Sequence, residues 1–176
     1  MITTLGMFSY LVAGKDTSAA YLGEKYGFKH ISLSDMLRAE AKRQGLTTDR
    51  EQLRLVANKL KGEQGDGVLA ELAKKELSDR TIITAIRHPK EVEVLRTIPG
   101  FLLVEIFAPI DVRYNRAVLR GRDAGDKLTF EEFKASEERE NSGGQMLNAV
   151  AKLVDRRIDN SGTFEQLYTQ LNELVA

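Results

Sequence analysis

Cysteine is absent from the 176 residues of this chain. Its absence excludes disulfide bonds, thiolate catalysis and cysteine-ligated metal sites. Histidine is scarce, since only His30 and His88 can supply an imidazole, and the two lie far apart in the sequence. We expect neither histidine to form a metal site with the acidic residues of the chain.

An excess of either charge is also missing, because 26 lysine and arginine residues balance 26 aspartate and glutamate residues. A net charge of zero gives no general electrostatic reason to expect nucleic acid or an anionic membrane as a partner. No apolar run reaches the roughly 18 residues of a membrane-spanning helix. The amino-terminal sequence lacks the charged start and the cleavage site of a secretory signal. We therefore expect a cytoplasmic protein with neither of these partners.

The length suits one domain, and a content of 42% hydrophobic and 30% charged residues is typical of a globular protein. Short apolar runs alternate with longer amphipathic stretches along the chain. This alternation predicts a single α/β domain over residues 1–176, a three-layer α/β/α sandwich with a five-stranded parallel sheet. The expected strands are 2–10, 28–33, 81–86, 101–109 and 156–159. The expected helices are 14–26, 34–44, 47–63 with a cap at Thr48, 67–78, 110–120, 130–141, 146–154 and 162–175.

Ligands of parallel α/β sheets bind beyond the carboxyl ends of the strands. Four segments are expected to meet there, namely 9–17, 34–38, 84–89 and 108–111. The first of them contains "GKDT" (14–17), the second half of the phosphate-binding pattern G-x-x-x-x-G-K-[ST]. The first glycine of that pattern is replaced by Ser9. The segment is either a phosphate site with unusual chemistry or an ordinary strand-to-helix turn.

Lys15 favours the phosphate site, because a cation at a helix start is disfavoured by the helix dipole unless an anion binds there. Gly14 allows the backbone to approach a phosphate closely. The hydroxyl of Thr17 can serve the α-phosphate of a bound nucleotide. Asp16 leaves two interpretations open: an acid that suits the first helical turn, or a residue that helps hold a magnesium ion through water.

Five segments, in this order, resemble those of P-loop nucleoside and nucleotide kinases. They are "AGKDT" (13–17), "GFKHISLSDMLRAEAKRQGL" (27–46), "IITAIRHPKEVEVLR" (82–96), "APIDVRYNRAVLRGR" (108–122) and "DNSGTFEQL" (159–167). The second is similar to the ISTGDMLR segment of adenylate kinases, and the fourth to the helix that enters an arginine-bearing lid. The branch resembled is adenylate kinase-like, dephospho-CoA kinase-like or deoxynucleotide monophosphate kinase-like.

The resemblance implies a P-loop NTPase fold with acceptor-binding helices at about 34–78 and a small lid at about 120–142. It implies an ATP-dependent phosphotransferase that uses Mg²⁺ and a nucleotide-like small molecule: a nucleoside monophosphate, a deoxynucleotide or a dephospho-CoA type acceptor. Three residues depart from the family pattern: Ser9 and Val12 replace glycines, and Thr84 replaces the acid that ends the third strand. These departures support an alternative, a nucleotide-binding module with little or no turnover. Whether two chains form a homodimer stays open.

On the acceptor side, Asp35 could orient or deprotonate an acceptor hydroxyl, or it could cap a helix together with Ser34. Arg38 and Arg87 could clamp an anionic group of the acceptor, since guanidinium groups bind phosphate in a bidentate manner. Arg87 is expected to end a buried strand, where a charge needs a partner. His88 could line the same pocket. The substrate-binding candidates are thus Ser34, Asp35, Arg38, Arg87 and His88.

Arg113, Arg116 and Arg120 are three and four residues apart and share one helix face, with Arg122 just beyond it. They could face a polyphosphate together, or pair with acids such as Asp111, Asp123 or Glu138. The resemblance assigns Arg116 and Arg120 to the lid, and Asn160 and Gly162 to the adenine side. The cofactor-binding candidates are Ser9, Ala13, Gly14, Lys15, Asp16, Thr17, Arg116, Asn160 and Gly162. The catalytic candidates are Lys15, Asp35 and Arg120, and Asp16 is the metal candidate. His30 is expected to be a hydrogen-bonded strand residue.

Overall fold

A five-stranded parallel sheet forms the centre of the computed structural model, which describes residues 3–121, 128–142 and 146–176. The strands are β1 (Thr4–Phe8), β2 (Lys29–Ser32), β3 (Thr81–Thr84), β4 (Phe101–Phe107) and β5 (Arg156–Asp159), in the order β2-β3-β1-β4-β5. Every residue of β1 is buried, because β3 and β4 flank it and helices cover both faces of the sheet. The predicted three-layer sandwich around a five-stranded parallel sheet is confirmed.

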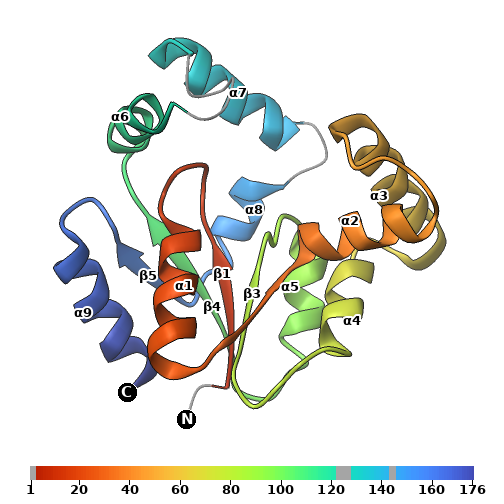
Figure 1. The fold of residues 1–176 in the computed structure, drawn as a ribbon, viewed down its shortest axis with the longest axis horizontal. Helices are drawn as coiled ribbons and strands as arrows, with labels where there is room; N and C mark the ends of the chain where they lie inside the picture. Colours follow the sequence, from red (N-terminus) through yellow and green to blue (C-terminus); the bar gives the residue numbers. More distant parts are fainter. Residues whose placement is uncertain (1–2, 122–127, 143–145) are drawn as a thin grey trace.

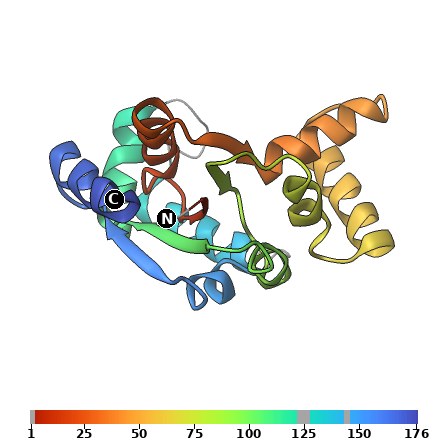
Figure 2. The same cartoon turned by 90° about the horizontal axis from the view of Figure 1, so that it is seen from below.

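Helices cover both faces of the sheet (Figures 1 and 2). Their bounds are α1 (Lys15–Tyr26), α2 (Leu33–Arg43), α3 (Arg50–Gln64), α4 (Val68–Lys74), α5 (Pro89–Leu95), α6 (Ile110–Arg120), α7 (Phe130–Ser142), α8 (Leu147–Ala151) and α9 (Phe164–Val175). α1 and α9 pack on one face of the sheet, with Leu22 and Leu171 in the same apolar cluster as Met7 of β1. α2, α3, α4, α5 and α8 share the second apolar cluster, on the other face. α6 and α7 lie above the carboxyl end of the sheet (Figure 1).

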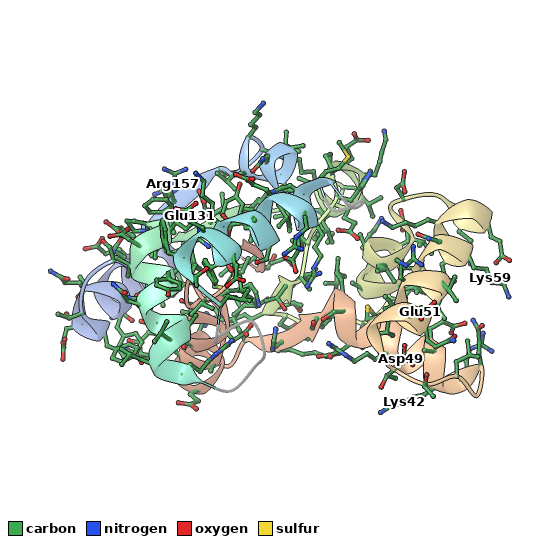
Figure 3. All side chains as sticks on the ribbon, turned by 90° about the horizontal axis from the view of Figure 1, so that it is seen from above. Lys42, Asp49, Glu51, Lys59, Glu131 and Arg157 are labelled. Atoms are coloured by element: carbon green, nitrogen blue, oxygen red, sulfur yellow. The ribbon has the colours of Figure 1, made fainter. Side chains whose placement is uncertain are left out.

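α2 and α3 project beyond β2 at one end of the sheet (Figure 2). The charged side chains of Lys42, Asp49, Glu51 and Lys59 lie on the outside of this arm (Figure 3). Among the described residues, no helix combines the length and the apolar character that a bilayer crossing requires.

Several element boundaries differ from the prediction because local hydrogen bonds decide them. α3 is capped by the carboxylate of Asp49, which accepts from the backbone N–H groups of Glu51 and Gln52, so Thr48 is not the cap. α4 ends at Lys74 rather than at residue 78. A helix that was not expected from the sequence, α5, follows β3, with His88 at its N-cap and Glu91 completing a capping box.

The centre of β1 has no room for a side chain. A Cβ atom added to Gly6 would lie 2.6 Å from Cζ of Phe101 and 3.0 Å from the Cδ1 atoms of Ile86 and Leu103. We expect Gly6→Ala to lower the free energy of unfolding by about 1–3 kcal/mol through overpacking. Urea unfolding of the full chain measures the change.

Gly62→Ala is the matched control, because Gly62 lies within α3 and has open space around it. Apart from the backbone of its own helix, no described atom lies within 4 Å of a Cβ added there. That variant should gain about 0.5–1 kcal/mol from the higher helix propensity of alanine. Equal effects of the two substitutions would contradict the steric account of Gly6.

Candidate functional site

A cavity of about 1030 Å³ opens at the carboxyl ends of β1, β2 and β3. It brings together the loop after β1, the start of α2, the segment after β3, the end of α6 and the segment before α9. The predicted site residues that line it are Ser9, Ala13, Gly14, Lys15, Asp16, Thr17, Ser34, Asp35, Arg38, Arg87, Arg116, Arg120, Asn160 and Gly162. Residues from five segments that are distant in sequence thus share one space.

The loop of residues 9–14, called the 9–14 loop below, runs from β1 into α1. Gly14 occupies the N-cap of α1 with φ 99°, a conformation that favours glycine. A side chain there would collide with the Asn160 carboxamide, whose Nδ2 donates to the carbonyl of Ala13 at 2.8 Å. Val12 has φ 62°, which is strained for a β-branched residue. The loop therefore keeps a backbone conformation that favours glycine, although valine stands at this position.

Lys15 and Asp16 form an ion pair at the start of α1. The Lys15 side chain is 20% exposed, whereas that of Asp16 is 86% exposed. Asp16 is therefore a helix-start acid that also neutralises the lysine, and it lies with Thr17 at the cavity. Among the residues that the structure describes, no three histidine, aspartate or glutamate side chains form a metal-binding group. The Asp16 carboxylate and the Thr17 hydroxyl are nevertheless oxygen donors of the kind that Mg²⁺ prefers when a bound phosphate completes its shell.

On the opposite side of the cavity, Asp35 lies in the first turn of α2 and accepts from Nη1 of Arg38 at 2.6 Å. The same guanidinium reaches Oγ of Ser34 at 3.2 Å. The N-cap position belongs to Ser32, because β2 ends there, and no side chain caps the helix. The interpretation of Ser34 and Asp35 as helix caps is therefore wrong, and both polar groups lie free of that role at the cavity.

The segment after β3 differs from the prediction. β3 ends at Thr84, so Arg87 lies three residues beyond it, with an exposed side chain at the cavity rather than at the end of a buried strand. His88 does not line the cavity. Its Nδ1 accepts from the backbone N–H of Lys90 at 3.1 Å, and its Nε2 lies 3.8 Å from the carboxylate of Asp66. The side chain of His88 therefore serves α5, a helix that was not anticipated.

The three arginines of α6 do not act as one set. Arg113 is only 4% exposed, and its guanidinium is paired with Glu137 of α7, so the expectation that it faces a polyphosphate is wrong. Glu137 is not one of the acids that were expected as partners, namely Asp111, Asp123 and Glu138. Arg116 and Arg120 line the cavity. Nη1 of Arg116 is buried and has no hydrogen-bond partner among the described residues.

Part of the predicted lid lies outside the described residues, which do not include 122–127 and 143–145. Arg122 and Asp123 are among the residues left out.

Several cavity residues were missed as site candidates, among them His30 and Phe164. His30 is the hydrogen-bonded strand residue that was expected, with Nε2 at 2.8 Å from Oγ1 of Thr84, but it also lines the cavity. The alternation of β2 carried this signal, since His30 and Ser32 point to the same face of the strand. Phe164, the first residue of α9, is 62% exposed at the cavity, and an aromatic residue directly after the Thr163 cap was the available signal.

Comparison with known proteins agrees with this arrangement. Residues 12–134 match the family described as AAA domain (AAA_17). A UPF0200 protein of Pyrobaculum aerophilum is 36% identical over 182 residues, which cover 99% of this chain and 98% of that protein. The chain belongs to the AAA domain family and to the UPF0200 proteins.

Two further comparisons define what this AAA domain shares with other proteins. A UPF0200/UPF0201 protein of Archaeoglobus fulgidus is 27% identical over 179 residues, 97% of this chain, and the chain spans 54% of that protein's length. The structure of shikimate kinase from Acinetobacter baumannii in complex with shikimate has a TM-score of 0.60 and 11% identity, covering 99% of this chain and 92% of that chain. At that identity the likeness shows a shared P-loop kinase fold.

The environment of His30 predicts how the stability of this AAA domain depends on pH. Burial, and after it the positive charge of Lys15, lower the pKa of the His30 imidazole. The unfolded chain therefore takes up this proton near the ordinary pKa of about 6.5, whereas the folded protein takes it up only at lower pH. The free energy of unfolding should fall as the pH is lowered from about 7 to about 5.

His30→Gln removes this proton uptake, so the variant should lose less stability than the native chain over the same pH interval. Urea unfolding at both ends of the interval measures the difference. His88 remains in both proteins, so its own lowered pKa cancels in the comparison. An equal loss in the two proteins would contradict the assignment to His30.

Proposed function

We propose that the protein is a phosphotransferase that binds ATP with Mg²⁺ and transfers the γ-phosphoryl group to a nucleotide-like, hydroxyl- or phosphate-bearing small molecule. The supporting observation is that one cavity joins the Lys15 side of the 9–14 loop to the Asp35 and Arg38 side of α2. Phosphoryl transfer needs a donor and an acceptor in line within one space that excludes water, and it needs no covalent intermediate. The kinase fold shared with shikimate kinase is consistent with this chemistry.

Each side of the cavity has its own role in the proposal. The backbone N–H groups of the 9–14 loop and the amino end of α1 bind the phosphate chain. The ammonium of Lys15 leaves Asp16 and reaches the β- and γ-phosphates. Magnesium, when bound with ATP, neutralises phosphate charge, and the carboxylate of Asp16 and the hydroxyl of Thr17 would hold it, directly or through water. Asn160 keeps the loop in place through the carbonyl of Ala13.

On the acceptor side, Arg38 and Arg87 bind an anionic group. Asp35 orients the attacking oxygen and takes its proton when the acceptor is a hydroxyl. Arg120 closes over the charge that develops on the transferred group. Nη1 of Arg116, buried and without a hydrogen-bond partner in the described part of the chain, supports an anion at this end of the cavity, because a bound phosphate oxygen would satisfy it.

A second candidate function is nucleotide binding with little or no turnover. Two observations favour it. The backbone of Val12 is strained, so the loop holds its shape at a higher energetic cost than with glycine at this position. Thr84, at the end of β3 where the family pattern has an acid, is 1% exposed and bonded to His30, so no carboxylate at that position helps to place magnesium.

A thermal-unfolding screen of the full chain tests nucleotide binding first. ATP at 100 times its Kd should raise the free energy of unfolding by about 2.7 kcal/mol, which corresponds to a Tm increase of about 5–10 °C for a chain of this length. Lys15→Ala should remove most of this shift, since it removes the cation that contacts the phosphates. Lys59→Ala, at an exposed position of α3, should keep it.

Release of ADP with a panel of acceptors then separates the two candidates. The panel contains nucleoside monophosphates, deoxynucleotides and dephospho-CoA. Turnover with one of them that Asp35→Asn reduces by about 10²–10⁴-fold supports the kinase. An ATP-dependent shift without ADP release from any acceptor supports the binding module. The absence of any shift would contradict both.

A further inference from the structure

Arg113 links three segments that meet beside the cavity. Its Nε donates to the carbonyl of Ala108, just past β4, at 3.0 Å. Its Nη1 donates to the carbonyl of Leu11, in the 9–14 loop, at 3.2 Å. The two Nη atoms also donate to the carboxylate of Glu137 at 2.5 and 3.1 Å. One guanidinium therefore connects the sheet, the 9–14 loop and α7, and α6 and α7 lie above the loop in Figure 1.

The 9–14 loop needs support from outside because its own sequence does not favour its shape. Val12 holds φ 62° without being glycine, a conformation that persists only where the surroundings enforce it. The carbonyls on both sides of Val12 are bonded by distant side chains: that of Leu11 by Arg113, and that of Ala13 by Asn160 at 2.8 Å. The strained residue is thus held between two fixed carbonyls.

Glu137 in turn determines where the guanidinium of Arg113 lies. A guanidinium that is 4% exposed needs a counter-charge, and the paired geometry with one carboxylate fixes its plane. The rings of Tyr10 and Phe133 lie 5.4 and 6.0 Å from it and complete its surroundings. Because Glu137 belongs to α7, the orientation of Arg113 depends on the position of that helix.

We propose that Arg113 is a positioning residue which, together with Glu137, holds the 9–14 loop in its phosphate-binding shape and so couples the loop to α7. The proposal rests on the proposed function in one respect only: that the ligand bound by the loop is a phosphate. The shape of the loop itself can be tested without any ligand.

Hydrogen exchange of the full chain without ligand gives the first test, with Glu137→Gln as the variant. Glutamine keeps the length of the side chain but removes the charge that orients Arg113. The amide of Ala13, which donates to the carbonyl of Tyr10 at 3.3 Å, should exchange at least about tenfold faster than in the native chain. Arg113→Lys, which keeps the charge but loses the planar fork, should have the same effect on this amide.

Arg157→Gln is the matched control. Arg157 lies on β5 and its Nε donates to the carboxylate of Glu105, which is 1% exposed, at 2.7 Å. Its loss also breaks an arginine–carboxylate pair, but Arg157 does not line the cavity. The control should lower the stability of the chain without accelerating exchange in the 9–14 loop. Unchanged exchange in Glu137→Gln, or equal acceleration in Arg157→Gln, would overturn the proposal.

The affinity for ADP, measured by titration, gives the second test. Glu137→Gln should bind ADP about tenfold more weakly than the native chain, and Arg157→Gln should bind it equally well. If the native chain binds ADP and Glu137→Gln binds it with the same affinity, the proposal is also overturned. Absence of ADP binding by the native chain would reject the proposed function, and the exchange experiment would still decide the role of Arg113.

Discussion

The hydrogen-bond ladder of β1, paired with β3 on one side and with β4 on the other, fixes the position of everything around the cavity. A central parallel strand is covered on both faces, so its chain can leave the sheet only at its ends. The 9–14 loop therefore emerges in the middle of the carboxyl edge, between the ends of its neighbours. α1 follows directly and places its amino end beneath the loop. At Gly6 this strand packs so closely that an added Cβ would collide with Phe101 and Leu103 of β4 and with Ile86.

The architecture was predictable because alternation of strand and helix, once all the strands are parallel, leaves few arrangements of a five-stranded sheet. α5 was missed since seven residues are too short to show a clear period, and its start depends on the mutual bonds of His88 and Glu91. The role of Arg113 was misjudged for a different reason. Spacing shows which residues share a helix face, but not whether that face meets solvent or another helix, and Glu137 lies 24 positions further along the chain.

The cavity was predicted better than the individual roles of its residues. The segments at the strand ends met as expected, since that follows from topology alone. The roles of individual residues depend on side-chain pairing: Asp35 pairs with Arg38, Lys15 with Asp16, and His30 with Thr84. Sequence spacing suggests the first two pairs but gives no reason to choose them over contacts with a ligand. The third joins residues 54 positions apart that become neighbours only through the register of β2 and β3.

The ion pair of Lys15 with Asp16 has a consequence for how a ligand arrives. A bare lysine at a helix start would attract anions over a distance of about one Debye length, roughly 8 Å at physiological ionic strength. Here the neighbouring carboxylate cancels most of that field, and the chain as a whole carries no net charge. Attraction of an anion from a distance is therefore left to the arginines of the cavity, among them Arg87, whose side chain is exposed. Lys15 contributes only at contact, when its ammonium exchanges the Asp16 carboxylate for the phosphate, so this lysine acts in selection inside the cavity and not on the approach to it.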